Sequence, residues 1–341
     1  MHPLKLLSLR VTPLRFRLET LGPFRVPEYK GALFRGGFGQ FFRDLVCITR
    51  APVCTGCADL ARCAYSLVFE TPVQPEIFTV LRKYPNAPHP FVMTPPLDGR
   101  TAMGAGVEMA LDVTLIGRGV EYLPHFVYVL EKMGASGRYG GRFRLRGVDS
   151  PVDGAAVYDG ATRRIVRRPV EWRGRDGEAA RSIQLEFQTP LRMRTEGQYN
   201  TSPNFTQIAQ ALLRRLSLLG AIYGAAPAEG NDWLHRLMAQ VDQVRTESAE
   251  FRVYHWDRMS GRQGRRVQMD GVVGRVRAVG DLTELAAWFR VGEWVHVGSG
   301  TSMGMGGTGW KRRNSGWRSS FSRSWTPTRF TTTCFRRMSC G

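Results

Sequence analysis

The apolar residues repeat with two different periods along this 341-residue chain, and the two periods alternate in a similar order in each half. An alternation of two is typical of half-buried strands, and a spacing of three to four is typical of amphipathic helices. The first half predicts a strand, a helix, a strand, a helix and a strand, at residues 7–18, 33–43, 105–116, 126–133 and 142–146. The second half predicts a strand, a helix, two strands, a helix and a short strand, at residues 183–187, 205–219, 251–256, 267–276, 282–289 and 294–297. We therefore expect an α+β fold with a repeated sandwich.

The junction between the halves is expected within residues 149–180, which are rich in Gly, Asp and Arg and have little apolar periodicity. This divides the chain into an N-terminal domain at 1–180, a C-terminal domain at 181–306 and a tail at 307–341.

The charge of the chain favours a polyanionic partner. Forty-eight Lys and Arg residues against twenty-nine Asp and Glu residues give a formal charge of +19, which suits phosphate binding; the alternative is a merely basic protein. No apolar run reaches the roughly 18 to 20 residues that span a bilayer, and no apolar signal core follows the first residues. We therefore expect a cytoplasmic protein that binds nucleic acid and no membrane.

Four cysteines form a cluster with the spacing C-x6-C-x2-C-x5-C, at Cys47, Cys54, Cys57 and Cys63. In a reducing compartment such a cluster holds metal more often than disulfides, and four thiolates can surround one tetrahedral zinc ion. The alternatives are four unliganded thiols or an iron–sulfur cluster.

A glycine-rich loop follows the last predicted helix, at Gly298, Gly300, Gly304 and Gly306. Glycines let the backbone approach a phosphodiester and leave amide groups to donate to it. The spacing G-x-G-x-x-G and a Walker lysine are both absent, so a nucleotide site is not indicated. The alternative is a tight turn between a helix and a strand.

This loop, ending in Gly-Thr-Ser-Met-Gly-Met-Gly, resembles the carboxy-terminal signature of the RAMP endoribonucleases that process CRISPR precursor transcripts. Four further segments are similar and lie in the family's order: residues 29–39, 54–65, 134–146 and 254–263. The resemblance implies two tandem ferredoxin-like domains, with the cysteine knuckle inserted in the first. It also implies a basic cleft for repeat RNA and cleavage by the RNA's own 2′-hydroxyl, leaving a 2′,3′-cyclic phosphate. No cofactor is then needed for catalysis, and any zinc would be structural.

The expected RNA-binding residues combine arginine clusters with the loop. Arginines near Tyr254 and Trp256 can neutralise phosphates while the aromatic rings stack on unpaired bases. The alternative is a solvated edge strand whose charges prevent aggregation. The candidates are Arg138, Arg142, Arg144, Arg214, Arg258, Arg262, Arg265 and Arg266, with Gly298, Gly300, Thr301, Ser302, Gly304 and Gly306 of the loop.

Internal attack needs a base for the 2′-hydroxyl, a cation for the phosphorane and an acid for the leaving oxygen. Many family members place a histidine in the helical region of the first domain, but residues 3–88 contain none. The candidates are His89, His255 and His296 as the base, Tyr29 or Tyr65 as an acid or positioning group and Arg35 as the charge stabiliser. Each histidine has another interpretation. His89 can be read as an ordinary exposed loop residue, His255 as a base-stacking or structural residue, and His296 as a packing or RNA-contact residue.

The missing histidine keeps a second function open, a non-catalytic RAMP subunit that binds RNA within a CRISPR effector complex. A third is a zinc-knuckle protein that binds unrelated nucleic acid. The partners expected are repeat RNA or its processed product, and effector subunits under the second function.

The tail after the loop differs from the rest of the chain. It has eight basic residues, no acidic residue and neither apolar period. One interpretation is a basic segment that binds RNA; the other is a reading-frame error. A shifted frame through residues 307–315 can encode Tyr-Arg-Leu-Glu-Glu-Thr-Glu-Phe, and the codons of Trp310 and Lys311 force its fourth residue to be Glu. With a frame error, we expect the second domain to lack its last strand.

Overall fold

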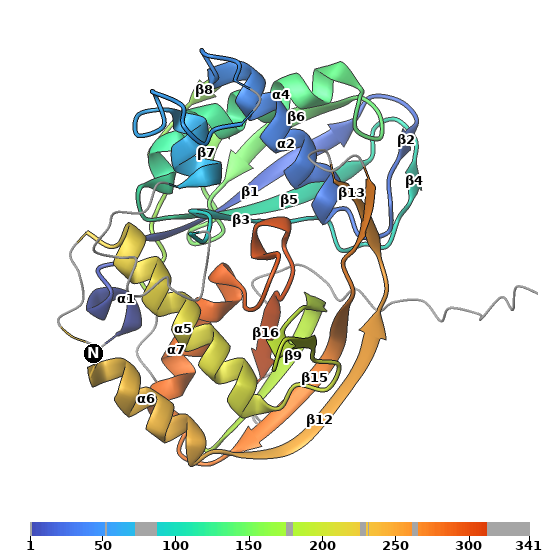
Figure 1. Ribbon diagram of the computed structural model, residues 1–341. Coiled ribbons are helices and arrows are strands. Elements are labelled where there is room, and N and C mark those ends of the chain that lie inside the picture. The colour runs from blue at the N-terminus through green and yellow to red at the C-terminus, as the bar shows by residue number, and fades with distance from the viewer. Residues whose placement is uncertain are drawn as a thin grey trace, which may run out of the picture.

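Two antiparallel sheets, each covered by helices, make up the two lobes of the protein (Figure 1). The computed structural model describes residues 2–51, 53–71, 87–174, 180–225, 230, 232–260 and 265–311. Among these residues, no helix has the length and apolar character that crossing a membrane requires.

The first lobe has a six-stranded sheet in the order β3-β5-β1-β6-β7-β8, and all neighbouring strands are antiparallel. The strands are β1 (Val11–Thr20), β3 (Phe91–Thr94), β5 (Glu108–Ile116), β6 (Phe143–Asp149), β7 (Ala156–Asp159) and β8 (Arg164–Ile165). Helices α2 (Gly31–Val46) and α4 (Leu123–Ser136) contact each other and cover one face of the sheet. The core between them is aromatic, because α2 contributes the buried rings of Phe34, Phe38 and Phe42.

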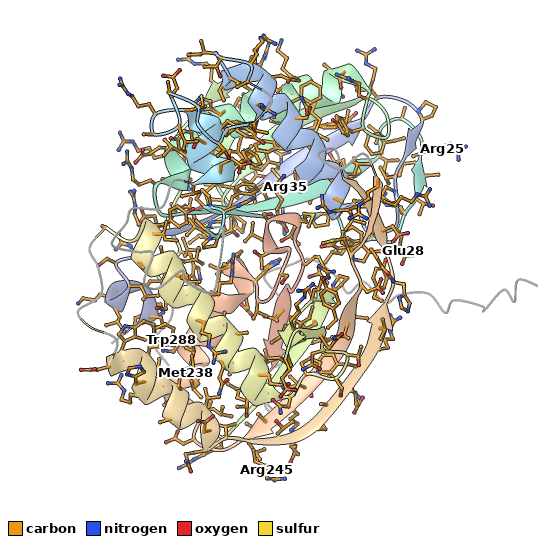
Figure 2. The ribbon with its side chains drawn as sticks, in the orientation of Figure 1. Arg25, Glu28, Arg35, Met238, Arg245 and Trp288 are labelled. Atoms are coloured by element: carbon orange, nitrogen blue, oxygen red, sulfur yellow. The ribbon has the colours of Figure 1, made fainter. Side chains whose placement is uncertain are left out.

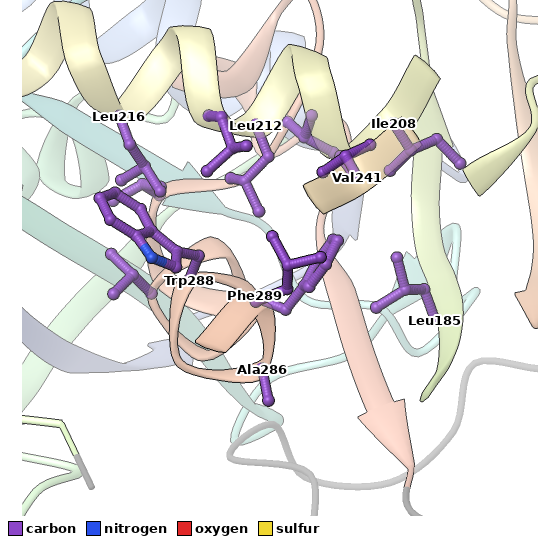
Figure 3. Close-up of a cluster of buried hydrophobic side chains, with 14 of the residues drawn as sticks. Leu185, Ile208, Leu212, Leu216, Val241, Ala286, Trp288 and Phe289 are labelled. Atoms are coloured by element: carbon purple, nitrogen blue, oxygen red, sulfur yellow. The ribbon is translucent and has the colours of Figure 1, made fainter. Parts of the chain in front are cut away.

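The second lobe has a four-stranded antiparallel sheet in the order β12-β15-β9-β16. Its strands are β9 (Ser182–Leu191), β12 (Arg245–Tyr254), β15 (Gly271–Val279) and β16 (Thr308–Lys311), and its helices are α5 (Phe205–Tyr223), α6 (Asp232–Asp242) and α7 (Thr283–Val295). Figure 3 shows Leu212 and Leu216 of α5 packed near Trp288 and Phe289 of α7. The Trp288 ring also stacks on Trp233 of α6, with 4.9 Å between the ring centroids.

The same connection underlies both sheets. Each lobe runs strand, helix, strand, strand, helix, strand, and the four strands lie in the spatial order second, third, first, fourth. The first residues of the chain do not stay with the first lobe: the short helix α1 (Pro3–Leu6) brings Leu4 and Leu7 into the core of the second.

Short elements complete the described chain. Three small hairpins pair β2 (Phe24–Arg25) with β4 (Ala102–Met103), β10 (Arg194–Thr195) with β11 (Gln198–Tyr199), and β13 (Asp257–Ser260) with β14 (Arg265–Gln268). The remaining turns of helix are η1 (Ser66–Glu70), η3 (Gly117–Tyr122) and η4 (Thr301–Met303).

Several expected elements differ from the observed ones. Helix α2 is longer than the helix expected at residues 33–43 and includes glycines, because a Cβ at Gly37 would lie 2.7 Å from Met133 and one at Gly39 would lie 3.3 Å from Phe69. Small residues there let the helix pack closely. The N-cap of α5 is Asn204, in a capping box with Gln207.

The expected strand at residues 294–297 is wrong, because α7 continues to Val295 and His296 ends it with a φ of 60°. The expectation that the second sheet lacks its last strand is also wrong. Residues 308–311 pair with β9 from Phe187 to Gln184, through backbone groups that need no apolar side-chain period. The rest of the tail, residues 312–341, lies outside the described residues.

Candidate nucleic-acid interface

The glycine-rich loop lies where the two lobes meet. It leaves α7, approaches β3 and α2 of the first lobe, and returns as β16 (Figure 1). Gly298, Gly300, Gly304 and Gly306 all have positive φ, between 68° and 86°. A Cβ at Gly304 would lie 2.6 Å from the carbonyl oxygen of Met93 on β3. Packing between the lobes therefore requires glycine here, whatever the loop binds.

Much of the loop faces the protein. Thr301, Gly304 and Gly306 are buried, whereas Gly298, Gly300 and Ser302 keep part of their surface exposed. The amide of Gly306 donates to Pro190, and the amide of Ser299 donates to Arg192, at 3.0 and 2.8 Å. The loop residues whose surface stays open to a ligand are therefore Gly298, Ser299, Gly300 and Ser302.

His296 ties the loop to both lobes. Its Nδ1 donates to the carbonyl oxygen of Met305 at 3.1 Å, and its Nε2 accepts from the Thr94 hydroxyl at 3.3 Å. The side chain is fully buried, and burial lowers its pKa to about 4, with a smaller effect from the charge of Arg215. Both ring nitrogens are engaged, so His296 is a structural support in this arrangement.

Tyr29 has a similar place at the start of α2. Its hydroxyl donates to the carbonyl oxygen of Met303 at 2.8 Å, and its ring packs edge-on against Trp256 with 4.8 Å between centroids. Burial raises its pKa well above 10. Tyr29, Met303 and Met305 belong to a third apolar cluster, which joins the two lobes.

Arg35 and His89 meet on the first lobe, close to the second. Figure 2 shows Arg35 on the side of α2 that faces the second lobe. Its Nη2 lies 2.6 Å from His89 Nε2, and because a guanidinium can only donate, the imidazole nitrogen accepts. Burial, followed by the charges of Arg35 and Arg215, lowers the pKa of His89 to about 3. His89 is therefore neutral, with its only lone pair used by Arg35.

His255 is arranged differently. It follows β12, and its side chain is 73% exposed. Its Nδ1 lies 2.8 Å from Asp270 Oδ2, and a second donor, Gln268 Nε2, lies 2.6 Å from the same oxygen. An Nδ1–H that donates to a carboxylate leaves Nε2 with a free lone pair. This is the arrangement that a general base requires.

The expected RNA-binding arginines lie on both lobes. Arg138, Arg142, Arg144, Arg214, Arg265 and Arg266 are exposed, Arg258 is half-buried, and Arg262 lies outside the described residues. Arg258, Arg265 and Arg266 share the β13–β14 hairpin, which follows His255. Arg144 is partly neutralised, because it and Arg146 pair with Glu19 at 2.8 and 3.3 Å. Arg214 lies 3.4 Å from Gln210 on its own helix.

Sequence reasoning missed Asp270 and the pair Arg192 and Tyr199. Asp270 lies fifteen residues from His255 and has no motif around it. The signal for the pair was available: Arg192, Arg194 and Tyr199 flank a Glu-Gly turn directly after β9.

The four cysteines line one cavity of about 240 Å³, together with His125 and Asp59. The Thr49 hydroxyl lies 3.9 Å from Cys47 Sγ and 3.6 Å from Cys57 Sγ, so it separates two of the expected ligands. Within the described part of the chain, no three Cys, His, Asp or Glu side chains are close enough together to hold one ion. The zinc site therefore stays a prediction from the sequence.

Comparison with known proteins places this site in context. The family model of the CRISPR-associated endoribonuclease Cas6 matches residues 185–308, and a family described as an N-terminal domain matches residues 9–170. A protein of Archaeoglobus fulgidus, described as uncharacterized, is 27% identical over 304 residues, which are 88% of this chain and 97% of that protein.

Solved structures show the same fold. Thermus thermophilus Cas6 in a product complex has a TM-score of 0.53 and 16% identity, over 88% of this chain and 100% of that one. A partial Cas6-RT-Cas1–Cas2 complex has a TM-score of 0.53 and 12% identity, over 91% of this chain and 47% of that one.

Proposed function

Because this chain is a Cas6-like protein of the CRISPR systems, we propose that it binds repeat RNA in precursor transcripts and cleaves it to give crRNA. The cut leaves a 5′-hydroxyl and a 2′,3′-cyclic phosphate and needs no metal. Both lobes are then ferredoxin-like domains, which is supported by their shared strand order of second, third, first, fourth. The charge of +19 suits a substrate with many phosphates.

The observation that carries this proposal is the exposed pair of His255 and Asp270. The Asp270 carboxylate, 2.8 Å from Nδ1, fixes the neutral tautomer and orients the ring. Nε2 then accepts the proton of the 2′-hydroxyl as its oxygen attacks the adjacent phosphorus. The new O2′–P bond forms, the P–O5′ bond breaks, and the leaving 5′-oxygen takes a proton from the imidazolium or from water. Asp270 acts on the reaction through His255 and is a positioning residue.

A cation is needed for the charge that develops on the phosphorane. Arg258 lies on β13, the first strand of the hairpin that leaves this site, and its Nε is buried without a hydrogen-bond partner among the described residues. Arg258 is therefore the cation that we assign to this role.

The other candidates fit the reaction less well. The lone pair of His89 is occupied by Arg35, both nitrogens of His296 are occupied, and the Tyr29 hydroxyl donates to Met303. Arg35 lies beside His89 rather than beside His255 in these contacts. We therefore assign these residues to the interface between the lobes and keep His255 as the base.

The second function is a non-catalytic RAMP subunit that binds crRNA beside other CRISPR proteins. It is favoured by the sequence of α2, which has no histidine where the family resemblance implies one. Under this function, the same surface holds RNA without cutting it.

The test is incubation of the full chain with the CRISPR repeat RNA that neighbours its gene, in excess EDTA, followed by mapping of both product ends. One cut with a 2′,3′-cyclic phosphate and a 5′-hydroxyl is the expected result. Binding of intact RNA would overturn catalysis in favour of the subunit. Equal binding of scrambled RNA would exclude both functions and favour an unrelated nucleic-acid partner.

A further inference from the structure

We propose that Arg192, Arg194 and Tyr199 form a phosphate clamp, a subsite that holds one backbone phosphate of the RNA strand beside His255. The inference rests on the proposed function, because it supplies a substrate contact for the same site. It concerns the β10–β11 hairpin, which follows β9 and precedes α5.

The aromatic ring organises two cations. The Arg192 and Arg194 guanidinium carbons lie 4.0 and 4.6 Å from the centroid of the Tyr199 ring. Arg194 Nη2 also donates to the Tyr199 hydroxyl at 2.9 Å. Tyr199 is nevertheless 42% exposed, so this is a surface feature and not part of a core. Stacking orients planar guanidinium groups, which suits them for phosphate recognition.

The hairpin itself is fixed at both ends. Its turn residues Glu196 and Gly197 both have positive φ, as a two-residue hairpin turn requires. Asn200 closes it by donating from its amide to the Met193 carbonyl oxygen at 3.0 Å and from Nδ2 to Gln207 at 3.0 Å. Gln207 belongs to the capping box of α5, so the start of this helix anchors the hairpin. A preorganised subsite loses little conformational entropy on binding.

The charge at the clamp is not balanced within the protein. Among the described residues, no carboxylate forms an ion pair with Arg192 or Arg194. Burial lowers the pKa of Arg192, and the positive charges of Arg194 and Arg258 lower it further. The charge of Asp270 opposes this effect, but its Oδ2 is already bonded to His255 and Gln268. Three adjacent cations without a matching set of anions form a site for an external anion.

The clamp is joined to the proposed base through Arg192. Its Nε donates to the Asp270 carbonyl oxygen at 3.1 Å, and its Nη2 lies 3.3 Å from that of Gln268. Its own carbonyl oxygen accepts from Ser299 of the glycine-rich loop at 2.8 Å. A strand held by the clamp therefore lies next to both His255 and the exposed part of the loop.

The chain contains a matched control for this arrangement. Tyr128 on α4 is 40% exposed, and Lys132 Nζ lies 5.1 Å from its ring centroid. Its exposure is similar to that of Tyr199 and it also has a stacked cation, but it lies on a helix of the first lobe. If substitution of Tyr199 weakens RNA binding and substitution of Tyr128 does not, the effect comes from the clamp and not from the loss of any exposed aromatic ring.

The experiment measures the Kd of the full chain for 2′-O-methyl repeat RNA, which cannot be cut by internal attack, over a series of salt concentrations. The proteins are wild type, Arg194→Ala, Tyr199→Ala, Tyr199→Phe and Tyr128→Ala. We expect Arg194→Ala and Tyr199→Ala to weaken binding about 10-fold, and Arg194→Ala to reduce the salt slope by about 1. Tyr199→Phe keeps the ring and should stay within about 3-fold of wild type, and Tyr128→Ala should be unchanged.

Failure of the clamp is distinguishable from failure of the proposed function. The clamp alone would be overturned if the wild-type chain binds the RNA and the variants Arg194→Ala and Tyr199→Ala bind it with the same affinity. An equal loss for Tyr128→Ala would also overturn it. Wild type that fails to bind repeat RNA at all would overturn the proposed function and the clamp with it.

Discussion

Buried His296 makes the junction of the two lobes sensitive to acid. Its folded-state pKa is about 4, against about 6.5 for an exposed histidine, because burial disfavours the charged ring and Arg215 adds to this. The unfolded chain therefore binds the proton first as the pH falls. The stability contributed by neutral His296 is fully present above about pH 6.5 and is lost as the pH falls toward 4.

The size of the effect follows from the difference between the two pKa values. The two pKa values differ by about 2.5, and one pKa unit corresponds to about 1.36 kcal/mol. The free energy of unfolding therefore falls by about 3 kcal/mol once His296 is protonated in both the folded and the unfolded state. Between about pH 7.5 and about pH 5 the loss from His296 is about 2 kcal/mol. His89 acts in the same direction, since its pKa is lowered to about 3.

The assay is chemical unfolding at about pH 7.5 and about pH 5, for wild type, His296→Asn and His235→Asn. The asparagine amide at 296 can still donate to Met305 but cannot be protonated, so the variant should lose about 2 kcal/mol less than wild type between the two pH values. His235 is exposed on α6, and His235→Asn should keep the wild-type difference. Equal losses in wild type and His296→Asn would refute the reasoning.

Two further predictions concern the loop and the last strand. Gly304 and Gly56 both have a φ of 80°, but of these two only Gly304 has backbone atoms where a Cβ would lie. Gly304→Ala should therefore lower the free energy of unfolding by about 2 kcal/mol more than Gly56→Ala. Equal losses for the two variants would contradict this. A chain ending at Lys311 keeps β16 and should retain the thermal stability of the full chain. A chain ending at Gly307 loses this strand, which pairs with β9, and should unfold at a lower temperature. Identical melting temperatures of the two truncated chains would contradict the role of β16.

Regular periodicity made most of the fold predictable. The apolar stripe of α5 and the alternation of β9 both appear in the sequence, and both elements form where they were expected. Helix α2 was underestimated because glycine has a low helix propensity, while its close contacts with Met133 and Phe69 are tertiary. Helix α6 was missed although Trp233, Leu237 and Val241 have helical spacing, because three apolar positions on a short helix of eleven residues give only a weak periodic signal.

The site was less predictable, because its chemistry depends on partners that are distant in sequence. His255 was a candidate, but only its contact with Asp270 distinguishes it from His89 and His296. Those two are engaged by Arg35 and Thr94, which lie 54 and 202 residues away. The side-chain types were visible in the sequence, whereas the direction of each hydrogen bond was not.

The most direct test of the central claim is the single-turnover cleavage rate of repeat RNA in excess EDTA, for His255→Gln and for His235→Gln. Glutamine at 255 cannot take the proton of the 2′-hydroxyl, so the rate should fall on the order of 10²- to 10⁴-fold, with the Kd for uncleavable RNA unchanged. His235→Gln should cut at the wild-type rate. Wild-type cleavage by His255→Gln would contradict the assignment of His255 as the base.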